Sequence, residues 1–271
     1  MKIALHYKRE NKEIIDIVNN EAKKYGLFFD EKNPDVVISI GGDGTFLRAI
    51  HTYINQLDKI LFVGINNGTL GFFYDFAKDE IPSLIKMIAE KGYQIKEHHL
   101  IRGDIKCANK EETIFAVNEI RIENPFHTLI SEVYINDEKL ETFRGSGLLV
   151  SSTLGSSAYN KSLGGALMDN DINALQLTEI APISNNVYRS LGSSFVLSNK
   201  KTITFSGDFK HVVVGYDYLN LEEKELVSIK ISQADKVVRV LHNENHSDIQ
   251  RIRKSFILWF IPIWKMILMR F

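Results

Sequence analysis

The sequence has little of three features that define whole classes of protein: cysteine, excess charge and long apolar runs. Cys107 is the only cysteine in 271 residues, which excludes an intrachain disulfide and a zinc cluster built on thiolates. Lys and Arg number 33 against 34 Asp and Glu, so binding of nucleic acid through bulk electrostatics is not expected. Hydrophobic residues make up 44%, which is ordinary for a protein with a real core, and the length suits one large domain or two modest ones.

The two ends of the chain also lack targeting and membrane-spanning patterns. Residues 1–7 lead into charged residues instead of an apolar stretch with a cleavage site, so no secretory signal is expected and the cytoplasm is the expected location. Residues 256–269 are mostly apolar, but as a helix they would reach only about 21 Å against a bilayer core of ~30 Å. Pro262 would also break that helix. We expect the tail, residues 259–271, to pack on its own domain or on a partner subunit; an interfacial membrane anchor, with Trp259 and Trp264 at the headgroups, and a disordered terminus are the alternatives.

The apolar pattern divides the chain into two parts. Up to about residue 95, strand and helix patterns alternate, which predicts a parallel, doubly wound, Rossmann-like sheet covered by helices. Residues 96–246 carry short strand-like runs divided by polar turns, with a helical stretch at about 156–166, and predict a mainly β domain. Residues 247–258 are expected to pack back on the first domain. In the first domain, strands are predicted at 2–6, 35–40 and 60–65, and helices at 11–25, 45–53 and 79–90.

Glycine is present in an ordinary amount but is unevenly distributed, because 11 of the 17 glycines fall in residues 41–71 and 145–165. The first group opens with Gly41-Gly42-Asp43-Gly44-Thr45, directly after a predicted strand. Glycine lets the backbone approach a ligand closely, and the N-terminus of the following helix offers N–H groups to an anion. The loop therefore indicates a phosphate site, although a tight turn capped by Asp43 or Thr45 would have the same sequence. It fits neither the dinucleotide nor the P-loop glycine spacing, which disfavours NAD-linked dehydrogenases and P-loop NTPases.

Three further clusters follow in chain order. The segment Gly64-Ile-Asn-Asn-Gly68-Thr-Leu-Gly71-Phe72-Phe73 succeeds the next strand, and since ligands gather at the carboxyl ends of parallel strands, it should line the same crevice as residues 41–45. Asn118-Glu119 pairs an amide with a carboxylate, which suits ribose hydroxyls. The stretch from Arg144 to Gly165 offers hydroxyl and N–H groups to a nucleotide. Taken alone, Phe72 and Phe73 are more often core residues, and Asn118 and Glu119 are more often exposed strand residues. The third cluster is equally explained as a serine-rich loop.

Taken together and in this order, the four motifs resemble the bacterial NAD kinase family. The resemblance runs over about residues 35–190 and is expected to extend over 1–258. It implies transfer of the γ-phosphate of ATP, or of polyphosphate, to the 2′-hydroxyl of the adenosine ribose of NAD. It also implies Mg²⁺ bound with ATP, and a homo-oligomer, dimer or tetramer, in which a neighbouring subunit completes the NAD site. The sequence itself contains no pattern of a dedicated metal site.

The resemblance assigns roles residue by residue. Asp43 matches the aspartate that orients the acceptor hydroxyl or takes its proton as general base. Phe72 matches an aromatic residue beside the adenine, and Asn118 and Glu119 match the pair that holds adenine and ribose. The phosphate loop comprises Gly41, Gly42, Gly44 and Thr45, and the remaining NAD-binding positions are Arg144, Ser146, Gly155, Ser157, Ala158, Tyr159, Ser162 and Ile183.

Three positions depart from the family pattern, all on the dinucleotide side. Ser146 stands where the family has Asp, Leu154 where it has Pro, and Tyr218 where Gly or His follows an Asp. Losing one charged hydrogen bond costs about 1.5–3 kcal/mol, or roughly 10–150-fold in affinity. Weak or altered NAD recognition would follow from such a loss. The Gly-Gly-Asp-Gly-Thr loop keeps the family pattern, so an active NAD kinase is favoured. A nucleotide-binding regulator of the same family with weak or no kinase activity and a related lipid kinase stay as alternatives.

Overall fold

The computed structural model describes residues 1–8, 11–66, 71–222, 225–243 and 247–257. The chain forms two compact units, one made of Met1–His98 with the chain from Val238 onward, and one made of His99–Val237. We call these the first and the second unit. Strands β5 (Gln94–Cys107) and β16 (Leu226–His242) carry the chain from one unit to the other.

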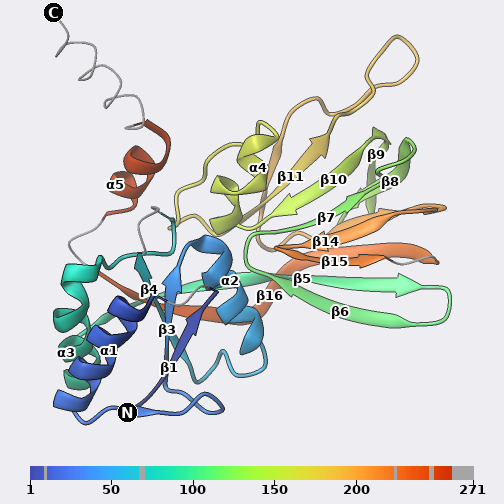
Figure 1. Cartoon of the computed structure of the whole chain (residues 1–271). Helices are drawn as coiled ribbons and strands as arrows, with labels where there is room; N and C mark the ends of the chain where they lie inside the picture. The colour runs from blue at the N-terminus through green and yellow to red at the C-terminus, as the bar shows by residue number, and fades with distance from the viewer. Residues whose placement is uncertain (9–10, 67–70, 223–224, 244–246, 258–271) are drawn as a thin grey trace, which may run out of the picture. The chain divides into compact units, whose positions relative to one another are not determined.

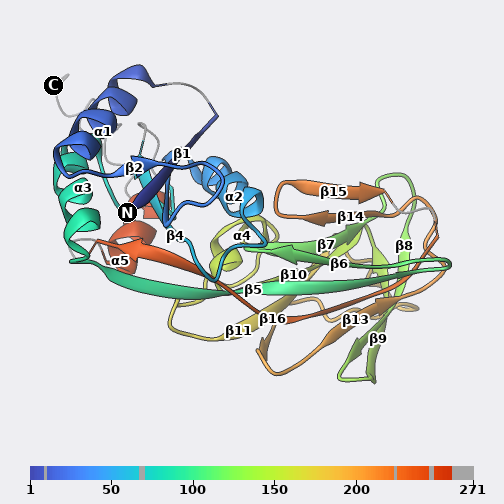
Figure 2. The ribbon, with the colours of Figure 1, turned by 90° about the horizontal axis from the view of Figure 1, so that it is seen from below.

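The first unit is a parallel sheet with helices on both faces. Its strands follow the order β2-β1-β3-β4-β16, and every pair is parallel. Helices α1 and α3 lie side by side on one face, and α2 lies on the other (Figures 1 and 2). The bounds are β1 (Lys2–Tyr7), β2 (Phe28–Phe29), β3 (Val36–Gly41), β4 (Leu61–Asn66), α1 (Lys12–Lys24), α2 (Asp43–Thr52) and α3 (Ile81–Glu90), with a 3₁₀ turn (Lys78–Glu80) before α3 and the short α5 (Asp248–Ile252) near the end.

Local sequence accounts for these helices. Asn11 caps α1 by accepting a hydrogen bond from the N–H of Ile14 (3.2 Å), and Ile14, Val18 and Ala22 are buried at helical spacing. Pro82 lies in the first turn of α3, where its missing N–H costs nothing, and four apolar residues of that helix are buried. Because both faces of the sheet are covered, residues 36–40 of β3 are all buried.

The second unit contains two β-sheets that share one core. One has the order β6-β5-β16-β13-β8-β9, and the other, entirely antiparallel, has the order β12-β11-β10-β7-β14-β15. Phe143 and Phe205 of the first sheet and Leu148 and Leu177 of the second belong to the same buried cluster. The bounds are β6 (Glu111–Ala116), β7 (Glu119–Glu123), β8 (Leu129–Ile135), β9 (Glu138–Gly145), β10 (Gly147–Ser151), β11 (Ala174–Ile180), β12 (Phe195–Ser198), β13 (Ile203–Ser206), β14 (Val213–Tyr216) and β15 (Leu219–Glu222).

The predicted fold class, a parallel α/β part followed by a mainly β part, is confirmed. The predicted helix at 156–166 is wrong, because the structure has only a 3₁₀ turn (Leu154–Ser157) and the single-turn helix α4 (Tyr159–Ser162) there. Gly164 has φ +83°, which ends the helical path, and Ser157 bonds back to the carbonyl of Leu154 (3.1 Å).

The apolar tail predicted for residues 259–271 lies outside the described residues. Among the residues that are described, no helix is long and apolar enough to span a bilayer.

Candidate functional site

Asp43 is the first residue of α2, and two backbone N–H groups from a distant loop hold its carboxylate. The N–H of Phe72 donates to Oδ2 (3.1 Å) and the N–H of Phe73 donates to Oδ1 (3.2 Å). Burial raises the pKa of Asp43, and these two hydrogen bonds oppose the rise without cancelling it. The carboxylate is therefore both fixed in direction and more basic than an exposed aspartate.

Gly71 makes this arrangement sterically possible. A Cβ atom at this position would lie 2.3 Å from Oδ1 of Asp43 and 2.9 Å from the ring of Tyr74. Only glycine lets the loop come close enough for its next two N–H groups to reach the carboxylate. The two glycine loops of the first unit thus lie together, as the order of the strands predicts. Residues 67–70 of the second loop, Gly68 among them, lie outside the described residues.

The predicted phosphate loop is open at the start of α2. The N-cap is Gly42, which has no side chain to occupy the helix N-terminus, and Gly44 is exposed with no atom within 4 Å of a Cβ built on it. The carboxylate of Asp43 faces Phe72 and Phe73 instead of capping its own helix, so the alternative of a turn capped by Asp43 does not describe this loop. Thr45 is buried, and its N–H donates to the carbonyl of Gly42 (2.6 Å).

Aromatic residues fix the second loop against α2. Phe46 of α2 stacks on Phe73, with ring centroids 4.9 Å apart and 6° between the planes. The hydroxyl of Tyr74 donates to the carbonyl of Gly42 (2.7 Å) and lies 3.4 Å from the hydroxyl of Ser39. Burial raises the pKa of Tyr74 well above its usual value, so the hydroxyl keeps its proton and its role as a donor.

The C-terminal part of the first unit holds the same loop from its other end. Asp75 is 5% exposed, and its carboxylate lies 2.8 Å from Nη2 of Arg251 and 2.9 Å from Nδ1 of His242. The N–H of Asn243 donates to the same carboxylate (3.2 Å). The ring of Phe256 lies 5.5 Å from that of Phe72. The short α5 and the residues after it thus anchor both ends of the 72–75 segment.

In the second unit, a second carboxylate is held by two consecutive N–H groups. Asp217 is buried, and it accepts hydrogen bonds from the N–H groups of Val117 (2.9 Å) and Asn118 (2.7 Å). Its own N–H donates to the carbonyl of Glu119 (3.1 Å). Asp217 therefore fixes the backbone of the predicted Asn118-Glu119 pair at the point where β7 begins.

Glu119 is a buried carboxyl that is left partly unsatisfied. It is 5% exposed, and its Oε2 makes no hydrogen bond to any described residue. Burial raises the pKa of Glu119 to about 8; the nearby Asp217 adds to the rise, and Arg121 opposes it. A buried polar atom without a partner is costly, so the orphaned oxygen is a natural place for a ligand hydroxyl.

The turn predicted to contact a nucleotide packs directly on Asn118. A Cβ atom at Gly155 would lie 2.0 Å from the carbonyl oxygen of Asn118, so only glycine fits there. The hydroxyl of Ser152 donates to the carbonyl of Val117 (2.6 Å) and accepts from the N–H of Gly155 (3.0 Å). These bonds close the turn although Leu154 stands where the family pattern has a proline.

The remaining predicted residues of the second unit form two groups. Ser157, Ala158, Tyr159 and Ser162 follow the Gly155 turn, and the hydroxyl of Tyr159 donates to Glu123 (3.3 Å). Arg144, Ser146 and Ile183 lie together elsewhere: the N–H of Ile183 donates to the carbonyl of Arg144 (2.7 Å). Glu123, which Tyr159 contacts, pairs with Gly147 beside Ser146, whereas Glu119 pairs with Ser151 at the other end of β10.

Sequence reasoning missed three residues that organise these loops: Asp75, Asp217 and Arg251. Asp217 directly precedes Tyr218 and is a lone acidic residue after the apolar run Val212–Tyr216, a pattern that could have drawn attention to it. Asp75 and Arg251 are 176 positions apart, and no local signal connects them. Among the described residues, no group of three His, Cys, Asp or Glu side chains could hold a metal ion.

Comparison with known proteins identifies relatives of both parts of the chain. The ATP-NAD kinase N-terminal domain matches residues 3–93, and the ATP-NAD kinase C-terminal domain matches residues 117–241. NAD kinase 1 of Bacillus cereus is 39% identical over 236 residues, which cover 86% of this chain and 89% of that protein. NAD kinase of Geobacillus stearothermophilus is 40% identical over 253 residues, 89% of this chain and 93% of that protein.

Two solved structures are similar at lower identity. Yeast NADH kinase complexed with NADH has a TM-score of 0.83 and 16% identity, covering 96% of this chain and 89% of that chain. An NAD kinase from Archaeoglobus fulgidus in complex with ATP has a TM-score of 0.74 and 20% identity, covering 94% of this chain and 97% of that chain. At these identities the two structures show a shared fold.

Proposed function

The chain belongs to the NAD kinase family, and on that premise we propose how its own residues carry out the reaction. The reaction is the ATP-dependent phosphorylation of NAD to NADP. Two relatives named NAD kinase match 86% and 89% of this chain, which disfavours the lipid kinase alternative. The observation that carries the assignment of roles is the carboxylate of Asp43, which is fixed and partly desolvated at the start of α2.

Asp43 acts as the general base for the 2′-hydroxyl of the adenosine ribose. The hydroxyl oxygen forms a bond to the γ-phosphorus of ATP, the bond from that phosphorus to the β–γ bridging oxygen breaks, and ADP leaves with the electron pair. The hydroxyl proton passes to the carboxylate of Asp43. A raised pKa makes this carboxylate a better proton acceptor, and the N–H groups of Phe72 and Phe73 keep it oriented.

The start of α2 receives the phosphates. Gly42 and Gly44 leave space for an anion, and the N-terminal end of the helix carries a partial positive charge. The described residues hold no cluster of three metal-binding side chains, so Mg²⁺ would take its ligands mainly from the nucleotide phosphates. When bound, the metal would neutralise charge that develops on the transferred group. We take ATP as the donor in preference to polyphosphate.

Asn118 and Glu119 bind the adenosine part of NAD. The orphaned Oε2 of Glu119 supplies a hydrogen-bonding position for a ribose hydroxyl, and a pKa near 8 leaves this carboxyl largely protonated at pH 7. In that form it both donates and accepts. Ser157, Tyr159 and Ser162 extend the binding surface along the turn after Gly155, and Phe72 is proposed as a further contact of the adenine.

Arg144, Ser146 and Ile183 bind NAD that is held by another copy of the chain. Within one chain the β7–β10 register keeps this group at the opposite end of β10 from Glu119. Ile183 is 39% exposed and Ser146 is exposed, so both are accessible to such a ligand. The assembly is therefore a homo-oligomer, a dimer or a tetramer.

The proposed location of the protein is the cytoplasm, where a free, buried Cys107 would stay reduced.

The assay for this function uses the purified full chain with ATP, Mg²⁺ and NAD. NADP is detected with a coupled NADP-specific dehydrogenase, and polyphosphate in place of ATP tests the donor. Formation of NADP with ATP is the expected result. NAD binding without turnover at high enzyme concentration would support the regulator instead, and no NADP together with no NAD binding would overturn the proposed function.

A further inference from the structure

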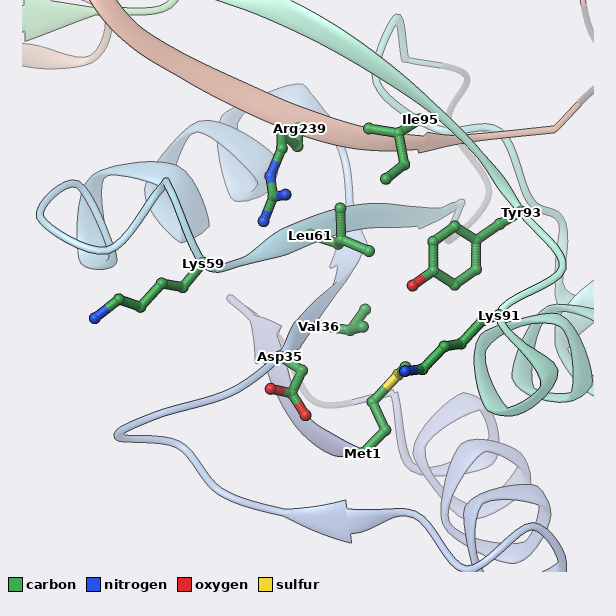
Figure 3. A pocket seen from close by; sticks show the side chains of 9 residues that line it. All are labelled: Met1, Asp35, Val36, Lys59, Leu61, Lys91, Tyr93, Ile95 and Arg239. Carbon is green, nitrogen blue, oxygen red and sulfur yellow. The ribbon is translucent and has the colours of Figure 1, made fainter.

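A pocket of about 480 Å³ lies in the first unit, away from the glycine loops (Figure 3). Val36 and Leu61, the first residues of β3 and β4, form part of its wall. Asp43 comes after the far end of β3, and a six-residue strand at roughly 3.3 Å per residue spans about 20 Å. The pocket is therefore at the opposite edge of the sheet from the phosphate loop and is not used in the proposed reaction.

Three cationic side chains and one carboxylate line this pocket. Arg239 and Lys91 extend toward it from two different sides, and Lys59 lies at its rim with the amino group turned outward (Figure 3). Arg239 is half-buried, and its Nε is buried without a hydrogen-bond partner among the described residues. None of the three cations forms an ion pair within the part of the chain that the structure describes. Asp35 instead accepts a hydrogen bond from the backbone N–H of Lys2 (2.7 Å).

A partly buried arginine without a counter-charge is costly unless an anion reaches it. Three cations against one carboxylate leave an excess of positive charge at this edge of the sheet. The planar guanidinium group of Arg239 matches two oxygens of a phosphate at once, which a lysine ammonium does not. The charge of the pocket therefore favours a phosphate over a neutral ligand.

Apart from these charged groups and the hydroxyl of Tyr93, the lining is apolar, which points to a ligand with an organic body. Val36, Leu61 and Ile95 contribute aliphatic surface, and the ring of Tyr93 faces the same space (Figure 3). A volume of about 480 Å³ is within the range typical of small-molecule sites. We propose that this pocket binds an organic phosphate monoester, with the phosphate on Arg239 and Lys91 and the organic part against the apolar wall.

Isothermal titration of the full chain with phenyl phosphate, and separately with inorganic phosphate, tests the proposal. The substitution Arg239→Gln should weaken binding of phenyl phosphate by at least about tenfold, since a charged hydrogen-bonded contact is lost. Lys91→Gln should weaken it by less. The matched control is Lys86→Gln, which removes one positive charge from an exposed position on α3 outside the pocket and should leave binding unchanged.

Two further measurements keep the test decisive. Arg239→Lys keeps the charge but loses the planar fork and should bind with intermediate affinity, and turnover of NAD within about twofold of wild type in all these variants would show an intact fold. Phenyl phosphate should bind more tightly than inorganic phosphate. Equal affinity for the two would overturn the apolar contact, and unchanged binding in Arg239→Gln, or equal loss in Arg239→Gln and Lys86→Gln, would overturn the site itself.

Discussion

In each unit an aspartate carboxylate, Asp43 in the first and Asp217 in the second, accepts two consecutive backbone N–H groups from a segment far away in the sequence, but the two aspartates differ in role. Asp43 is bonded to Phe72 and Phe73, and it is itself the proposed reacting group. Asp217 is bonded to Val117 and Asn118, and it positions its neighbours. In the proposed function, the same hydrogen-bonding geometry orients a reacting group in the first unit and substrate-binding residues in the second.

Asp43→Asn should have the largest effect on turnover. Asparagine keeps the size of the side chain but cannot take the proton, so kcat should fall by about 10²–10⁴-fold. Affinity for NAD, measured by titration, should stay within a few-fold, and circular dichroism should be unchanged. A kcat within tenfold of wild type would contradict the role of Asp43 as base.

Asp217→Ala should mainly affect NAD binding and stability instead of the chemical step. Two buried N–H groups lose their acceptor, at about 1–3 kcal/mol each. The free energy of unfolding in urea should fall accordingly, and KM for NAD should rise at least tenfold. Asp217→Asn retains one acceptor and tolerates the positive φ of 49° at this position, so it should be intermediate. A fall in kcat with unchanged KM would contradict the positioning role of Asp217, because it would show that Asp217, like Asp43, acts in the chemical step.

Arg251→Gln tests whether the C-terminal segment supports the reacting carboxylate through Asp75. Losing the partner of a buried carboxylate should lower the melting temperature, and kcat should fall by about threefold to tenfold because the loop that carries Phe72 and Phe73 is less well held. Arg251→Lys should recover part of the loss, and the exposed Lys86→Gln should have no effect. Full activity in Arg251→Gln, at a temperature where it is folded, would show that the loop positions Asp43 unaided.

Glu119→Gln should have the smallest effect on turnover at pH 7 and a clear effect on stability against pH. The folded-state pKa of about 8 lies above the ordinary value of 4.5, so between these pH values the folded protein binds more protons than the unfolded chain does. The free energy of unfolding of the wild type therefore falls as the pH rises from about 4.5 to 8. Each unit of that pKa difference corresponds to about 1.4 kcal/mol. Glutamine removes this loss, so the variant should gain on wild type toward pH 8 in urea unfolding. A constant difference across that range would show that Glu119 is not protonated in the folded state.

The sequence predicted the parallel part of the fold well because its signals are local. The strand 36–41, the glycines that follow it and the helix beginning at Asp43 are neighbours in the chain, and their pattern is independent of the rest of the molecule. The predicted helix at 156–166 is wrong because the hydroxyl of Ser157 bonds back to the carbonyl of Leu154 and Gly164 adopts a positive φ. The long strand β16 was also missed, since its burial pattern depends on partners far away in sequence.

By itself, the sequence determined the family, the two-part architecture and the glycine loops, since each depends on residue types at short, fixed spacings. Only the tertiary structure decided what orients those loops. The Asp43 carboxylate meets N–H groups 29 and 30 positions away, Asp217 meets Asn118 across 99 positions, and Arg251 meets Asp75 across 176. Hydrogen bonds between such distant groups leave no periodic signal, because the chain between them can vary without changing the contact. The unpaired charge of Arg239 likewise became visible only once the sheet brought β16 beside β4.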